Sequence, residues 1–226
     1  MKGAKIPKQF LELGGKPILA HTIQHFQDSP EIDSIVIVSI ASGIDRVHQI
    51  IKQNNFNKVR SVVPGGVTGQ QSIYYGLLEL EKIGYTKDND IVLIHDGVRP
   101  LIDHKTIEAC IQSVKNRGCT ATIAPSVETV IIEKDEKVET VMNRSRCKLA
   151  RAPQGFFSHQ ILSAHRQAID DSLDSFIDSI SLMAHYGYEI FTIEGPADNI
   201  KITTKRDFFA FKGYMDYKEM NQLWEN

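Results

Sequence analysis

The 226-residue sequence lacks the patterns that mark several common classes of protein. No apolar run is long enough to cross a bilayer, and no hydrophobic signal region follows Met1-Lys2-Gly3-Ala4-Lys5. The three cysteines, Cys110, Cys119 and Cys147, form an odd number without metal-ligand spacing. This pattern favours free thiols in a reducing compartment, so we expect a cytoplasmic protein without disulfide bonds.

The motifs of three enzyme classes are also missing. The sequence contains no His-Glu-x-x-His of zinc hydrolases, no Gly-x-Ser-x-Gly of serine hydrolases and no Gly-x-Gly-x-x-Gly of dinucleotide-dependent oxidoreductases. A net charge of −2 argues against a basic surface for nucleic acid. Hydrophobic and charged contents of 42% and 24% are ordinary for a globular protein, and the length fits a single α/β domain over residues 1–226.

Short β-branched runs alternate with segments of helical periodicity. The sequence predicts strands at 34–39, 58–63, 90–94, 122–125 and 189–193. It predicts helices at 16–28, 44–54, 72–83, near 157–170, near 174–186 and from about 206. This alternation predicts an α/β fold with a Rossmann-like, mostly parallel sheet flanked by helices. In such sheets ligands bind beyond the carboxyl ends of the strands.

The segment at about 124–146 has a different pattern. Two β-prone runs at 128–132 and 138–141 flank the polar stretch 133–137, which predicts a hairpin. A hairpin cannot bury both faces by itself, so it either lies on the domain or reaches a second subunit. We expect a protruding β-arm here.

Charged residues stand at the edges of apolar runs. Asp96 ends an apolar strand, where a carboxylate can bind Mg²⁺ or can cap a turn. Arg99 can hold a phosphate or pair with Asp96. Lys8 and Lys201 are either phosphate-binding charges or ordinary exposed lysines, and a lysine on an edge strand also blocks aggregation.

Two further segments have both a functional and a plain interpretation. Gly65 and Gly66 form a sharp turn after a strand, where bare backbone can approach a base or a phosphate, although most such pairs are only turns. Gln70 and Ser72 then begin a helix, whose N-terminus attracts anions. The four cations between residues 144 and 151 either hold a phosphate or form a solvated face.

The order of three phrases is more specific than any one of them. They are Ile6-Pro7-Lys8-Gln9-Phe10, His95-Asp96-Gly97-Val98-Arg99-Pro100 and Asn199-Ile200-Lys201-Ile202-Thr203-Thr204. With Pro64-Gly65-Gly66 and Pro153-Gln154, they resemble the cytidylyltransferases that join CTP to a sugar-alcohol phosphate, a likeness that covers nearly the whole chain. That family includes the 2-C-methyl-D-erythritol 4-phosphate and D-ribitol 5-phosphate cytidylyltransferases.

The resemblance implies roles for nine residues. CTP would be bound by Lys8, Gly65, Gly66, Ser72 and Asp96. The acceptor would be bound by Asp96, Arg99, Thr129, Arg144 and Lys201. Lys8, Arg144 and Lys201 would also be catalytic, and Asp96 would help to place Mg²⁺. The resemblance further implies a homodimer in which the hairpin arm brings Arg144 to the other subunit.

The sequence departs from the family pattern at four places. Met1-Lys2-Gly3 stands where the family's glycine-rich loop ends, so we expect the family's first strand and this loop to be absent and an apolar sheet edge to be exposed. Gly69 replaces a common arginine. Ala152 and Ile177 each replace a threonine on the acceptor side.

These departures bear on the acceptor and leave alternatives open. The two lost hydroxyls, Val98 and the long C-terminal helix favour a ribitol 5-phosphate-like acceptor, as used for capsule or teichoic-acid precursors. The alternative acceptor is 2-C-methyl-D-erythritol 4-phosphate of isoprenoid synthesis. A non-catalytic nucleotide-binding dimerisation module is the alternative from another class: the missing loop supports it, and the retained charged residues oppose it.

Overall fold

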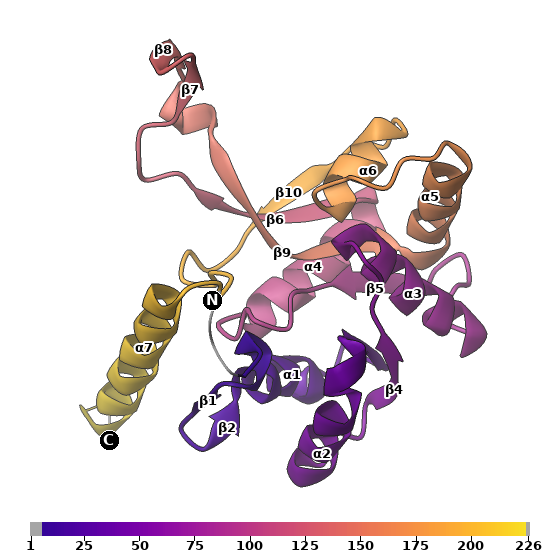
Figure 1. Cartoon of the computed structure of the whole chain (residues 1–226), viewed down its shortest axis with the longest axis vertical. Coiled ribbons are helices and arrows are strands. Elements are labelled where there is room, and N and C mark those ends of the chain that lie inside the picture. Colours follow the sequence, from indigo (N-terminus) through magenta and orange to yellow (C-terminus); the bar gives the residue numbers. More distant parts are fainter. Residues whose placement is uncertain (1–5, 225–226) are drawn as a thin grey trace.

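The computed structural model, which describes residues 6–224, places its longest strands in a four-stranded and a two-stranded sheet (Figure 1). The larger sheet has the order β10-β6-β9-β5, formed by Phe191–Glu194, Thr120–Pro125, Lys148–Phe157 and Ile91–Ile94. β6 pairs in parallel with β10, and β9 pairs antiparallel with both β6 and β5. Strands β5, β6 and β10 therefore share one direction, and β9 opposes them.

The smaller sheet contains β3 (Ile35–Ser39) and β4 (Val59–Pro64), which pair in parallel. Between them runs α2 (Ile44–Asn54), which buries Val47 and Ile50 along one helical stripe and ends at the left-handed residue Asn55. These elements lie within a residue of their predicted positions, because their periodicity is unbroken.

A cavity of about 590 Å³ separates the two sheets. Its walls are the backbone segments 34–38 of β3 and 89–95 of β5, and within residues 6–224 no strand pairs with these facing edges. Two helices, α1 (Ile18–Asp28) and α3 (Gly69–Lys82), contribute mostly apolar side chains to the lining. The structure thus contains the apolar sheet edge that the sequence predicts, and it contains it twice.

The sequence did not predict α4 (His104–Arg117) or β9, although both are central. Asp103 caps α4 by accepting a hydrogen bond from the backbone N–H of Thr106 at 2.8 Å. The helix packs on β5, β6, β9 and β10. At Gly155 of β9 the helix comes so close that an added Cβ would lie 2.8 Å from the Cys110 sulfur.

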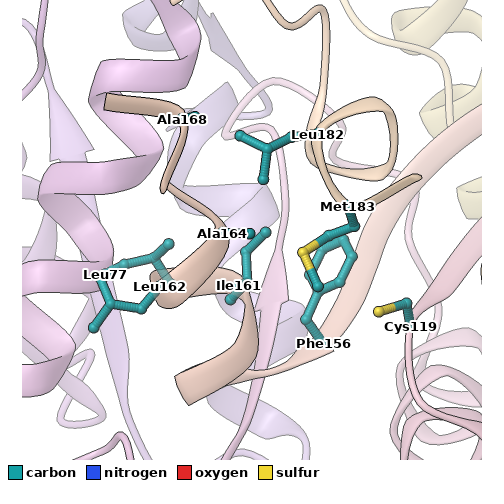
Figure 2. Packing of buried hydrophobic residues seen from close by; sticks show 9 residues of the cluster. All are labelled: Leu77, Cys119, Phe156, Ile161, Leu162, Ala164, Ala168, Leu182 and Met183. Atoms are coloured by element: carbon teal, nitrogen blue, oxygen red, sulfur yellow. The ribbon is translucent and has the colours of Figure 1, made fainter. Parts of the chain in front are cut away.

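Two helices cover another part of the larger sheet. The helices α5 (Ser158–Asp170) and α6 (Ser179–His185) enclose a core in which Phe156 of β9 meets Ile161, Leu182 and Met183 (Figure 2). The predicted helix at 174–186 is shorter than expected. It begins at Ser179 because Asp178 accepts the backbone hydrogen bond of Ser181 and caps the helix there.

The predicted hairpin is present and projects from the body of the molecule (Figure 1). It consists of β7 (Ile131–Lys134) and β8 (Lys137–Val141), joined at Asp135-Glu136, where both residues have positive φ. Every residue of the two strands is solvent-exposed, including the apolar Ile131, Ile132, Val138 and Val141. Such an arm leaves apolar surface uncovered in the single chain.

The final helix, α7 (Lys205–Trp224), extends along one side of the molecule and buries Phe211 against Ile18, Val98 and Ile202. The remaining short elements are η1 (Lys8–Phe10), β1 (Glu12–Leu13), β2 (Lys16–Pro17), η2 (Ala41–Gly43) and η3 (Arg144–Arg146). None of the described helices is long and apolar enough to span a membrane. The three cysteines are unpaired, as predicted.

Candidate active site

Asp96 lies at the centre of a charged cluster beyond the carboxyl end of β5. Its Oδ1 accepts a hydrogen bond from Nζ of Lys201 at 2.6 Å, and its Oδ2 accepts one from Nε of Arg99 at 2.8 Å. Both pairs are therefore ion pairs with short, charge-assisted hydrogen bonds. The structure thus brings Lys201 next to Asp96 and Arg99, although 105 positions separate Asp96 from Lys201 in the sequence, as the resemblance implied.

The loop that carries Lys201 is fixed from both sides. The backbone N–H of Ile202 donates to the carbonyl of Val98 at 2.9 Å, and Nη1 of the buried Arg99 donates to the carbonyl of Asn199 at 2.9 Å. The segment 200–203 is irregular rather than the strand end that the sequence suggested. Docking onto the His95–Arg99 segment, and not strand pairing, positions the Lys201 amine.

Lys8 in η1 is a third cationic residue of the cluster, and the charge of Asp96 acts on its pKa. Burial and the nearby charge of Lys201 lower the pKa of Lys8, and the negative charges of Asp96 and Asp207 oppose that shift. At the same helix, Phe10 packs in the core beside Ile37 of β3. η1 is therefore anchored to the core through Phe10, and its Lys8 lies within electrostatic range of Asp96 and Lys201.

The electrostatics of the cluster favour an ionised Asp96. Burial works to raise the pKa of Asp96, but hydrogen bonds from Lys201 and Arg99, together with their charges, outweigh burial and lower it. Among residues 6–224, Asp96 is the carboxylate that forms ion pairs with Lys201 and Arg99, and with Lys8 nearby the cationic side chains outnumber it. Such a site is suited to a ligand with several negative charges.

Gly65 and Gly66 follow β4 in a turn that α3 holds in place. The Gly65 N–H donates to the carbonyl of Ser39 at 2.7 Å, and the Gly66 N–H donates to Oγ of Ser72 at 3.1 Å. An added Cβ on Gly66 would collide with Gln71. Ser72 is thus bonded to the turn itself, and it supports the backbone that was predicted to recognise the base.

Thr129 and Arg144 lie on and beside the arm, apart from the cluster. Thr129 is exposed, and Arg144 is exposed with Nη1 donating to the carbonyl of Val127 at 3.3 Å. Within the described part of the chain, no contact links either residue to Asp96. In Figure 1 the arm points away from the body, so a single chain does not assemble all nine predicted site residues.

The side chains of the cluster can be compared with those that bind Mg²⁺ in other proteins. Among residues 6–224 no group of three or more His, Cys, Asp or Glu side chains is arranged to hold an ion. Mg²⁺ in nucleotide sites is commonly held by one or two carboxylates together with substrate phosphates and water. Asp96, a 30% exposed carboxylate with two further lone-pair positions, fits this kind of site as its protein ligand.

Two residues that border the cluster were not among the predicted site residues. Asn199 is buried, and its Nδ2 donates to the carbonyl of Ala152 at 3.0 Å. Arg151, which directly precedes Ala152, lies near enough to Arg99 for the two charges to repel. The sequence signal for Arg151 was its place in the group of four cations between residues 144 and 151. The Met1-Lys2-Gly3 segment, predicted to align with the end of the glycine-rich loop, lies outside the described residues.

Comparisons with known proteins agree on one family. The profile of the 2-C-methyl-D-erythritol 4-phosphate cytidylyltransferases matches residues 1–216. A ribitol-5-phosphate cytidylyltransferase of Streptococcus agalactiae serotype V is 45% identical over 96% of this chain and 90% of its own length. A 2-C-methyl-D-erythritol 4-phosphate cytidylyltransferase of Clostridium tetani is 35% identical over 98% and 87% of the two chains. The crystal structure of 4-diphosphocytidyl-2C-methyl-D-erythritol synthase from Anaerococcus prevotii superposes with a TM-score of 0.81 at 26% identity, covering 95% and 92% of the two chains.

Proposed function

The chain belongs to the 2-C-methyl-D-erythritol 4-phosphate cytidylyltransferase family, and from this membership we propose that it transfers CMP from CTP to D-ribitol 5-phosphate. The cytidylyltransferase activity follows from the family. The choice of acceptor rests on identity, because the ribitol-5-phosphate enzyme of S. agalactiae is 45% identical and the methylerythritol-phosphate enzyme of C. tetani is 35% identical. The replacement of two threonines by Ala152 and Ile177 points the same way.

In the proposed reaction a phosphate oxygen of the acceptor attacks the α-phosphorus of CTP. The bond between the α-phosphorus and the oxygen that bridges to the β-phosphate breaks, and pyrophosphate leaves with the electron pair. Catalysis of such a step depends mainly on positioning and on stabilising the developing negative charge. The observation that best supports this reaction is the cluster around Asp96, which concentrates Lys8, Lys201 and Arg99 at one strand end.

Within this cluster we assign distinct tasks. Lys8 contacts the triphosphate, since it is not held by a hydrogen bond to Asp96 and responds to it only through charge. Lys201 and Arg99 face the acceptor, and Asp96 fixes both by accepting one hydrogen bond from each. Asp96 would also hold Mg²⁺, which when bound neutralises phosphate charge. The turn at Gly65 and Gly66 would bind cytosine through backbone groups.

Thr129 and Arg144 complete the acceptor site only from a second copy. The exposed apolar residues of the arm support this proposal, because an uncovered hairpin of this kind is suited to a protein–protein contact. We therefore propose a homodimer in which each arm delivers Arg144 to its partner. A cytoplasmic location, where activated precursors of capsule or teichoic acid would be made, belongs to the same proposal.

The proposal is tested by pyrophosphate release. The protein is supplied with CTP and Mg²⁺, and D-ribitol 5-phosphate and 2-C-methyl-D-erythritol 4-phosphate are offered in parallel. We expect turnover with D-ribitol 5-phosphate and at most slow turnover with the other acceptor. The opposite preference would assign the chain to the isoprenoid reaction. Binding of CTP without turnover of either acceptor would support the non-catalytic nucleotide-binding alternative.

A further inference from the structure

Arg151 occupies a special position in the fold. In the pairing of β5 with β9, Ile94 stands opposite Gln154, so residues 151–153 run alongside the segment that follows β5. That segment carries Asp96 and Arg99. On the other side of β9, the register with β6 shifts between Ala121 and Ile123. Irregularities of this kind bend a strand and redirect its side chains, and they are common beside active sites.

The backbone around Arg151 is fixed by two buried hydrogen bonds. Asn199 Nδ2 donates to the carbonyl of Ala152 at 3.0 Å, and the hydroxyl of Thr122 donates to the carbonyl of Pro153 at 2.7 Å. Asn199 in turn accepts, through its own carbonyl, the hydrogen bond from Arg99. One network therefore sets the position of Arg151 relative to the Asp96 cluster.

The charges of the cluster are unevenly balanced. Asp96 compensates Lys201 and Arg99 directly, whereas Arg151 belongs to no ion pair found within residues 6–224. Nε of Arg151 is buried and without a hydrogen-bond acceptor in the same part of the chain. Burial and the like charge of Arg99 both oppose the charged form of Arg151 and lower its pKa. A half-buried guanidinium beside another guanidinium, with no carboxylate, is suited to receive an anion.

We propose that Arg151 binds the phosphate group of the acceptor within the same subunit, beside Arg99, and thereby contributes to acceptor affinity. This inference rests on the proposed cytidylyltransferase function. A guanidinium can donate two parallel hydrogen bonds to a phosphate, which a lysine cannot reproduce.

The test compares Arg151→Ala and Arg151→Lys with the unchanged protein. The control is Arg166→Ala, which removes an exposed arginine that pairs with Glu81 on the far helices α5 and α3. Loss of a hydrogen bond to a charged group should raise the KM for D-ribitol 5-phosphate about tenfold or more in Arg151→Ala. The KM for CTP and kcat should stay close to those of the unchanged protein. Arg151→Lys should lie between, and the control should change neither KM.

A second measurement separates this inference from the acceptor proposal. Calorimetric titration with inorganic phosphate, without CTP, reports the anion site whatever the natural acceptor is. We expect weaker phosphate binding in Arg151→Ala, with an unchanged melting temperature. Equal phosphate affinity and an equal acceptor KM in a folded Arg151→Ala protein would overturn the assignment, as would a rise in the KM for CTP alone. Failure of the unchanged protein to use D-ribitol 5-phosphate, with phosphate binding still dependent on Arg151, would reject only the acceptor.

Discussion

At the scale of single residues, the sequence identified charged residues that the structure brings together. Lys8, Asp96, Arg99 and Lys201 were chosen from the sequence because they stand at the edges of apolar runs in a known order, and the structure gathers them. Their pairing could not be predicted. Arg99 had two interpretations, as a phosphate ligand or as the partner of Asp96; the 2.8 Å ion pair shows the pairing, and the ligand role stays a prediction. Ser72 likewise supports the glycine turn through its hydroxyl.

Substitution of either lysine should affect turnover and leave the fold intact. Lys201 is 46% exposed in its side chain and Lys8 is also partly accessible, so neither Lys8→Ala nor Lys201→Ala opens a cavity. Loss of one preorganised cation at a developing charge typically lowers kcat by about 10²–10³. Pyrophosphate release and melting temperature should be measured for both variants.

Lys105→Ala is a matched control, because Lys105 is an exposed lysine of α4 and lies outside the cluster. Its turnover should equal that of the unchanged protein. Full activity in both Lys8→Ala and Lys201→Ala would remove the site assignment. A large fall in melting temperature would instead assign them a structural role.

At the scale of helices and strands, regular elements were predicted and irregular ones were not. The strand β9 was missed because Pro153 and Gly155 normally argue against a central strand. Pro153 is tolerated where the register with β6 shifts, and Gly155 is required where α4 packs closely against the strand. The helix α4 had the necessary signal in the sequence, since Ile107, Cys110, Ile111 and Val114 follow helical spacing and are all buried.

The arm is the element whose removal should change assembly. Deletion of residues 131–139 removes most of the exposed apolar side chains of β7 and β8 and should leave the core untouched, since no residue of the deleted segment is buried. We expect the deleted protein to sediment as a monomer and to lose turnover, because Arg144 would no longer reach a partner. Sedimentation velocity at several concentrations measures the first effect.

Glu136→Gly provides a control that keeps the arm. Glu136 has a φ of 62°, a value that glycine adopts without strain, so this variant should retain both the hairpin and the dimer. If the deleted protein sediments as a dimer, the arm is not the interface, and Arg144 must then act elsewhere or not at all.

At the scale of the whole molecule, the sequence predicted the fold class through its strand–helix alternation and its likeness to one family. It could not give the arrangement that depends on distant contacts. The order β10-β6-β9-β5 places the last strand of the chain beside one from its middle, and local periodicity holds no information on such pairing. Local periodicity likewise could not predict that Thr129 and Arg144 lie apart from Asp96, because this depends on the direction in which the arm leaves the body.

The stability of the whole molecule should depend on pH through a buried histidine. His165 is 2% exposed, and burial lowers its pKa to about 4, whereas the unfolded chain has a pKa near 6.5. Between these values the unfolded state binds a proton that the folded state does not. The contribution to stability is therefore complete above pH 6.5 and falls as the pH drops toward 4, by up to about 1.4 kcal/mol per pH unit.

Denaturant unfolding at pH 7, 6 and 5 measures this effect, with His165→Leu as the comparison. Leucine removes a buried nitrogen that has no hydrogen-bond partner among the described residues, so stability at pH 7 should be equal or higher. The loss of stability between pH 6.5 and 5 should be smaller in the variant. Some loss should remain, because burial also lowers the pKa of His95 to about 4. Parallel pH curves for the two proteins would contradict the assignment to His165.

The cavity between β3 and β5 has a consequence for the behaviour of the protein in concentrated solution. Two strand edges without strand partners in the described chain face each other across it, and their backbone groups can form ladder hydrogen bonds with any extended segment that enters. The apolar lining from α1 and α3 would stabilise such a segment further. We therefore expect this cavity to be one place at which copies of the chain associate at high protein concentration.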